Sequence, residues 1–174
     1  MIITDNLFIQ PLTQDNLKIL LEMRNNPEIN HFLTSVAPIN EIQEQSWFEK
    51  MCLDESKMYF EIKHVNQPNS FMGIVRTDEW DKINRSIRIG VDILPKYQGK
   101  GFGQEALKNM IEYLFSQLNL NRIWLLAAEY NKKAIHIYEK LGFKEEGKQR
   151  QAIYRDGKYN DYLMFGLLKE EYGK

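Results

Sequence analysis

The chain has 174 residues, of which 43% are hydrophobic, 27% charged and 12% aromatic. These proportions exclude a disordered chain, a collagen-like repeat and a small disulfide-stapled protein. Lysine and arginine number 23 against 24 aspartates and glutamates, and the formal charge of −1 provides no global field that would gather nucleic acid or anionic membranes. We therefore expect a single domain over residues 1–174 that buries its own core.

The sequence carries no sign of export or of membrane insertion. Cys52 is the single cysteine and cannot form a disulfide within the chain. The N-terminus lacks the basic segment and the apolar run of a secretion signal. No apolar stretch approaches the roughly 20 residues that a membrane span requires. We expect a cytoplasmic protein with neither a membrane nor a nucleic acid as its partner.

The first third of the chain reads as a strand followed by two helices. Leu7–Ile9 is the expected opening strand, and Thr13 is a favoured N-cap for the first helix. Asn40, with Gln43 three residues later, has the spacing of a capping pair and predicts the start of the second helix. Residues 27–39 between them are expected to form a loop or a broken helix. The apolar residues of the two helices are Leu17, Leu20, Leu21, Trp47, Phe48 and Met51.

The remainder alternates strands and helices. In chain order we expect a hairpin of strands 59–65 and 71–76, a strand 87–93, a helix through 107–114, a strand 123–128, a helix from Asn131 to Gly142, and a hairpin of strands 152–155 and 159–168 around Asp156-Gly157. A strand, a helix and a second strand in succession predict one parallel pair. The sequence therefore predicts an α+β fold with a mixed, mostly antiparallel sheet flanked by helices.

A glycine-rich segment, Gln98–Gly103, lies between the end of strand 87–93 and the next helix. Glycines let backbone N–H groups converge on an anion, and the helix N-terminus adds about half a positive charge. The Walker pattern is absent, and a dinucleotide fingerprint would need a glycine where Gln104 stands. The segment therefore indicates a phosphate or diphosphate site, with a ligand-free flexible turn as the alternative.

Two motifs resemble one known family. Gln98-x-x-Gly101-x-Gly103 is similar to the Q/R-x-x-G-x-G/A pattern of the GNAT acetyltransferases, and the segment Asn131–Phe143 resembles the second cofactor motif of that family. The resemblance extends over nearly the whole chain in element order and is sharpest from about residue 88 to 143. It leans toward the RimJ/RimL-like branch, which includes spermidine acetyltransferases.

The resemblance implies a single N-acetyltransferase domain with acetyl-CoA as co-substrate. The strand before the loop would pair with the pantetheine arm, the loop amides would hold the diphosphate, and a helix-capping asparagine would bind the arm. The cofactor-binding residues implied in this way are Val91, Asp92, Ile93, Gln98, Gly99, Lys100, Gly101, Phe102, Gly103 and Asn131. By the same resemblance Tyr138 is the catalytic acid, which donates a proton to the departing CoA thiolate. Tyr138 also belongs to an apolar helix stripe formed by Ala134, Ile137, Tyr138 and Leu141.

The resemblance does not provide the general base that a neutral amine nucleophile requires. Related enzymes often carry a glutamate on the polar face of this strand, whereas this chain has Arg88, Gly90 and Asp92 there. Asp92, Glu129 or a chain of water molecules remain the alternatives. The three histidines are scattered and predict no metal site.

The amine acceptor also stays open among several classes. Residues 36–56 hold five acids and one base, which would favour a cationic polyamine, although a solvated helix face explains them as well. The segment Arg24–Glu28 resembles that of amino-sugar acetyltransferases acting on nucleotide-linked sugars, and a protein N-terminus is a further acceptor class. A small-molecule amine is the expected partner, and a homodimer remains open. The alternatives to an enzyme are a non-catalytic module that senses acyl-CoA and an NAD(P)-binding protein, which the missing glycine disfavours.

Overall fold

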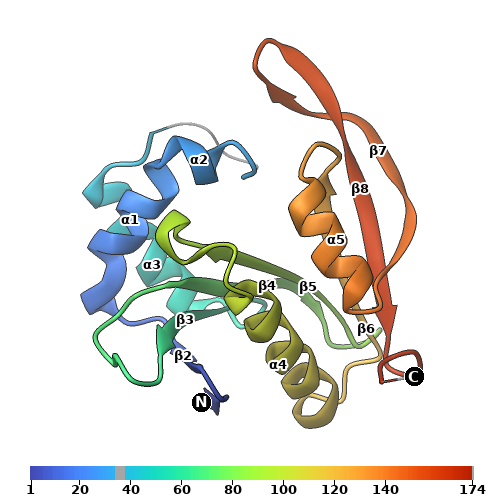
Figure 1. Cartoon of the computed structure of the whole chain (residues 1–174), viewed down its shortest axis with the longest axis horizontal. Coiled ribbons are helices and arrows are strands. Elements are labelled where there is room, and N and C mark those ends of the chain that lie inside the picture. Colours follow the sequence, from blue (N-terminus) through green and yellow to red (C-terminus); the bar gives the residue numbers. More distant parts are fainter. Residues whose placement is uncertain (34–37, 174) are drawn as a thin grey trace.

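The computed structural model describes residues 1–33 and 38–173. In this part of the chain eight strands form one mixed sheet in the order β1-β2-β3-β4-β5-β6-β8-β7 (Figure 1). The strands are β1 (Ile2–Ile3), β2 (Leu7–Pro11), β3 (Met58–His64), β4 (Gly73–Asp81), β5 (Ser86–Ile93), β6 (Arg122–Ala128), β7 (Lys144–Arg155) and β8 (Lys158–Leu168). The helices are α1 (Leu17–Asn25), α2 (Pro27–Asn30), α3 (Glu41–Leu53), α4 (Phe102–Gln117) and α5 (Lys132–Lys140).

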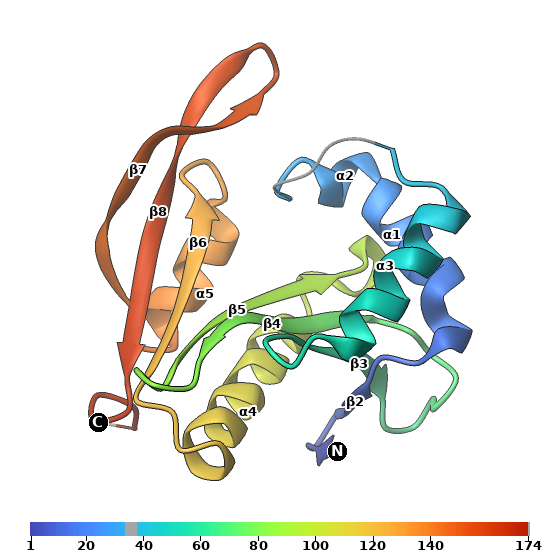
Figure 2. The ribbon, with the colours of Figure 1, turned by 180° about the vertical axis from the view of Figure 1, so that it is seen from behind.

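The parallel pair predicted from the order of strand, helix and strand is β5 with β6, and the other neighbouring strands are antiparallel. The α+β fold with a mixed sheet is therefore confirmed. β5 and β6 pair only through Ser86, Ile87 and Arg88, opposite Arg122, Ile123 and Trp124. Beyond this point the two strands part, and Figure 2 shows the sheet opening into two arms there. The first arm consists of strands β1 to β5, and the second arm consists of β6, β8 and β7.

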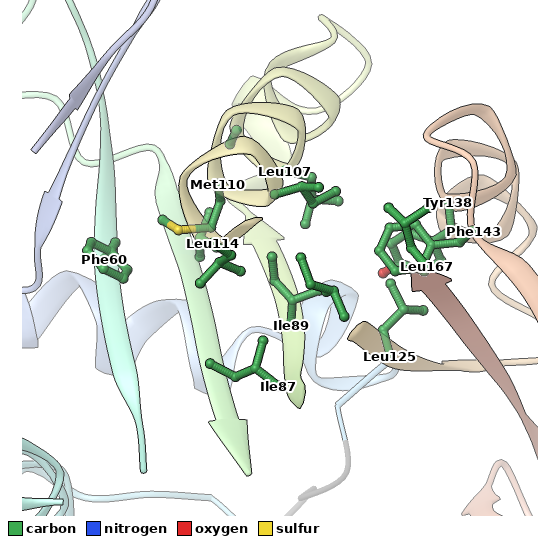
Figure 3. Close-up of a cluster of buried hydrophobic side chains, with 14 of the residues drawn as sticks. Phe60, Ile87, Ile89, Leu107, Met110, Leu114, Leu125, Tyr138, Phe143 and Leu167 are labelled. Carbon is green, nitrogen blue, oxygen red and sulfur yellow. The ribbon is translucent and has the colours of Figure 1, made fainter. Parts of the chain in front are cut away.

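The helices cover the first arm on both faces. α4 packs its buried residues Leu107, Met110 and Leu114 over β5, next to Ile87 and Ile89 (Figure 3). α1 and α3 form a second cluster on the other face, around Ile74 of β4. On the second arm, Tyr138, Phe143, Leu125 and Leu167 extend the main core between α5 and the strands β6 and β8.

Most local turn and cap predictions are confirmed. The Asn40 side chain accepts a hydrogen bond from the Gln43 amide at 2.9 Å, and the Gln43 side chain accepts one from the Asn40 amide at 3.0 Å, so α3 begins with a capping box. Asp156 and Gly157 have φ of 50° and 79° and join β7 to β8 as the predicted two-residue turn.

Several details differ from the prediction. Thr13 precedes a 3₁₀ turn without capping it, because its hydroxyl lies 3.2 Å from Oε2 of the fully buried Glu61 and donates to it. The segment 27–39 agrees with the predicted broken helix where it is described, because it contains the short helix α2; its residues 34–37 lie outside the described residues. β7 begins at Lys144 rather than at residue 152. The prediction missed this early start because the first nine residues of β7 are exposed and show no alternation of apolar and polar side chains.

No helix in the described ranges has the length and apolar character needed to cross a bilayer, and the cytoplasmic location stays a prediction.

Candidate active site

A cleft of about 860 Å³ lies where β5 and β6 part. Its walls come from β5, β6, the N-terminus of α4 and one side of α5, with α2 at its edge. Because β5 has no β6 partner after Arg88, the backbone groups of residues 89–93 on that side are left without a strand partner in the described chain. An extended ligand can form hydrogen bonds with them, as one more strand would. Val91, Asp92 and Ile93 all line the cleft.

The glycine-rich loop forms one end of the cleft. Gly99 and Gly101 have φ of 74° and 83°, in the left-handed region that only glycine adopts at little cost. No side chain caps the N-terminus of α4, so the first N–H groups of this 16-residue helix have no partner within it. These free donors and the helix dipole suit the oxygens of a diphosphate.

The predicted loop residues do not all have the same surroundings. Gln98, Gly99, Gly101, Phe102 and Gly103 line the cleft. The Gln98 side-chain amide donates to the Ile93 carbonyl at 2.8 Å, so it ties the loop to the end of β5 and leaves only its backbone to a ligand. Lys100 is not among the cleft-lining residues, and its ammonium lies 6.0 Å from the centre of the Tyr97 ring.

Helix α5 presents Asn131 and Tyr138 on the opposite wall. The Asn131 side chain accepts a hydrogen bond from the Ala134 amide at 3.2 Å, so it caps α5 and also borders the cleft. Tyr138 is 8% exposed, and its ring packs against Phe143 and Phe165. Burial, helped by the nearby Asp92 and opposed by Arg76, raises the pKa of Tyr138 to about 12. The phenol therefore keeps its proton at neutral pH and can act as a proton donor.

The predicted apolar stripe of α5 needs one correction. Ile135 and Tyr138 are the buried residues of this helix, whereas Ala134 and Ile137 are only half-buried. The reason is that Ala134 and Ile137 pack against the edge of the core and also line the cleft.

Two arginines that sequence reasoning did not bring together reach the cleft from adjacent strands. Arg76 on β4 forms an ion pair with Asp92 on β5, and Arg88 on β5 forms one with Asp78 on β4. Burial lowers the pKa of Arg76, but Asp92, Tyr59, Asp78 and Tyr138 together raise it above its usual value. The strand register explains both contacts, because it places Arg76 opposite Gly90 and Arg88 opposite Asp78. The sequence already placed Arg88 and Asp92 on the polar face of strand 87–93, but Arg76 lies on another strand and could not be placed beside them.

The two candidate bases differ in position. Asp92 lines the cleft, although its carboxylate is engaged by Arg76. Glu129 does not line it, and its Oε1 accepts a hydrogen bond from the Asp161 amide at 3.1 Å. Among residues 1–33 and 38–173, no group of three or more histidines, cysteines or carboxylates is arranged to hold a metal ion.

One further cleft residue was missed by the sequence reasoning. Tyr162 of β8 is 6% exposed, and its hydroxyl has no hydrogen-bond partner among the described residues. Burial raises the pKa of this phenol, while Arg155, Arg76 and Arg88 lower it. Tyr162 borders the cleft only because β8 pairs with β6, which local sequence patterns do not reveal.

The fold and the site define a protein suited to an extended ligand that carries a diphosphate, and comparison with known proteins identifies its family. Residues 6–144 match the family model described as an acetyltransferase (GNAT) domain. The chain therefore belongs to the GNAT acetyltransferase family, and acetyl-CoA is its co-substrate.

Several relatives match over much of the chain. A spermidine N(1)-acetyltransferase of Vibrio cholerae is 29% identical over 168 residues, which cover 95% of each chain. A putative ribosomal N-acetyltransferase of Bacillus subtilis is 37% identical over 103 residues, 59% of this chain and 56% of that protein. The crystal structure of spermidine N-acetyltransferase from Vibrio cholerae in complex with CoA and spermine superposes with a TM-score of 0.91 at 28% identity, covering 98% of this chain and 100% of that one.

Proposed function

We propose that residues 1–174 form one acetyltransferase domain that moves the acetyl group of acetyl-CoA to a primary amine by direct attack on the thioester. The observation that carries this proposal is the parting of β5 from β6, with an uncapped helix N-terminus at one end of the cleft and a protonated tyrosine on its wall. A thioester held along β5 would point into the space between the two arms.

In the proposed reaction the amine nitrogen forms the new C–N bond while the C–S bond of the thioester breaks. Tyr138 donates its phenol proton to the departing sulfur, and the amine loses one proton as the amide forms. Asp92 is the carboxylate nearest this chemistry among the two candidate bases, because Glu129 lies outside the cleft. The Arg76 guanidinium already engages the Asp92 carboxylate, so we assign the proton loss to a chain of water molecules.

The proposed residue roles follow the geometry. Backbone groups of Val91, Asp92 and Ile93 would hold the pantetheine arm, and the amides of residues 98–103 would hold the diphosphate. Asn131 would contact the arm from the opposite wall, and the backbone of Lys100 would contribute its amide. Relatives that match over nearly their whole length are named for spermidine, so a polyamine is one of the acceptor classes to be tested. A homodimer stays a prediction.

The test is release of free thiol from acetyl-CoA in the presence of single amines. The panel comprises spermidine, an amino sugar, a nucleotide-linked amino sugar and a short peptide with a free N-terminus. We expect amine-dependent thiol release with at least one of them, together with the acetylated amine as product. CoA binding without thiol release from any amine would contradict the proposal and favour an acyl-CoA-sensing module.

A further inference from the structure

The charged side chains that line the cleft are not complementary to a polycation. Its carboxylates are Glu28, Asp78 and Asp92, and arginines already pair with the last two. Glu28 has no ion pair or side-chain hydrogen bond with any described residue, so it is the single uncommitted acid in the described lining. A polyamine with three or more ammonium groups would meet one free carboxylate and the guanidinium groups of Arg76 and Arg88.

The same two arginines keep free donors for an anion. Arg76 uses only Nη1 in its contact with Asp92, and Arg88 uses Nε with Asp78 and Nη1 with Glu79 at 3.2 Å. The remaining guanidinium nitrogens have no hydrogen-bond partner among the described residues, and none of them is fully buried. They therefore reach open space in the cleft that both side chains line. The acidic partners fix the orientation of each planar guanidinium: Arg76 keeps Nε and Nη2 for bidentate binding of phosphate, and Arg88 keeps Nη2.

Gly90 gives Arg76 its place at the cleft. A Cβ on Gly90 would lie 2.9 Å from Cζ of Arg76, closer than real Cβ atoms approach, and 3.0 Å from its Nη2, which is a tight contact. The bare backbone of β5 therefore lets the Arg76 guanidinium lie across this strand, beside Asp92 and toward Tyr138. An acceptor amine that approaches Tyr138 would bring a neighbouring anionic group within reach of the two arginines.

We infer that Arg76 and Arg88 form an anion subsite, and that the acceptor is a small amine which carries a phosphate or diphosphate. This inference rests on the proposed function, because it assigns the acceptor class of the same reaction. A phosphorylated amino sugar and a nucleotide-linked amino sugar share this chemistry. Glu28 is free to contact the ammonium or hydroxyl groups of such a molecule.

The test compares kcat/KM for spermidine, glucosamine, glucosamine 6-phosphate and nucleoside-diphosphate-linked glucosamine at saturating acetyl-CoA. We expect the better of the two phosphorylated amines to exceed both glucosamine and spermidine by about tenfold or more, the gain expected from charge-assisted hydrogen bonds. Which of the two is better distinguishes a simple phosphate from a diphosphate source. A value for spermidine equal to or above those of both phosphorylated amines would overturn the inference while leaving acetyl transfer intact.

A conservative variant of Arg88 distinguishes hydrogen bonding of the anion by a guanidinium from attraction by positive charge alone. Arg88→Lys keeps the charge beside Asp78 but loses the planar guanidinium whose Nη2 is free for the anion, so we expect kcat/KM for the phosphorylated amine to fall about tenfold and that for glucosamine to change little. The matched control is Arg122→Lys, because Arg122 pairs with Glu146 outside the cleft. Equal losses for both amino sugars in Arg88→Lys would contradict the subsite. Absence of thiol release with every amine would overturn both this inference and the proposed function.

Discussion

Burial decides the protonation state of Tyr138. A phenol at the surface has a pKa near 10, and enclosure between the core and the cleft raises that of Tyr138 to about 12. The negative charge of Asp92 acts in the same direction, whereas Arg76 opposes it. At neutral pH the group is therefore a proton donor and not a base. This state suits a residue that must protonate a leaving thiolate.

Replacing Tyr138 by phenylalanine removes the donor and keeps the ring that packs against Phe143 and Phe165. We expect kcat to fall by roughly 10²–10⁴-fold, the usual contribution of a general acid, with little change in Tm or in the affinity for CoA. Steady-state thiol release and a thermal melt measure the two effects. Tyr113→Phe on α4, a tyrosine outside the cleft, is the matched control. An unchanged kcat in Tyr138→Phe would remove this residue from the mechanism.

The sequence predicted some of these residues and not others, for physical reasons. Asn131 and Tyr138 lie on one helix, two turns apart, so their common face follows from local spacing. Arg76 meets Asp92 only through the register of β4 with β5, and the role of Gly90 depends on the side chain above it. The local periodicity of a sequence does not predict which side chains meet between strands. The polar face of strand 87–93 could be predicted from the sequence, but the residues of β4 that it contacts could not.

At the scale of single elements, the loop before α4 and the start of that helix act together. The left-handed residues Gly99 and Gly101 turn the chain so that α4 begins without a cap and with free N–H groups at the cleft. No heavy atom lies within 4 Å of a Cβ built on Gly101, so the requirement there concerns backbone conformation and access for a ligand.

Gly101→Val tests this reading against a control with the same backbone strain. Gly157, in the turn between β7 and β8, has φ of 79° against 83° for Gly101, and a Cβ on either glycine meets open space. Each valine should cost about 1–2 kcal/mol of unfolding free energy, the price of a left-handed L-residue. Only Gly101→Val should also weaken CoA binding, by about tenfold or more. Calorimetric titration and denaturant unfolding of both variants measure this. Equal losses of CoA affinity in the two variants would contradict it.

Elements defined by local chemistry were predicted well, and those defined by distant partners were not. The capping box of α3 needs only residues three apart, and the turn of the closing hairpin needs only Asp156 and Gly157. Thr13 failed as a cap because Glu61, 48 residues later, takes its hydroxyl. The early start of β7 escaped prediction because its exposed residues pair with β8 through two register shifts.

At the scale of the whole molecule, the proposed function depends on two arms of one sheet. They are joined by three residue pairs between β5 and β6 and spread apart beyond them (Figure 2). Across the opening, the Tyr130 hydroxyl donates to the His31 carbonyl at 2.7 Å, and Nε of Arg155 donates to the same oxygen at 3.3 Å. The second arm thereby holds the chain that follows α2 at the edge of the cleft. The order of elements predicted the parallel pair, but the point of parting depends on how each arm packs.

The central claim is that this opening binds CoA through its diphosphate. The most direct measurement is calorimetric titration of the protein with CoA and, separately, with pantetheine, which lacks the diphosphate. We predict saturable binding of CoA and an affinity for pantetheine at least roughly 100-fold lower, because the hydrogen bonds from the loop and helix amides to charged oxygens are lost. Equal affinities for the two ligands, or no measurable binding of CoA, would contradict the account.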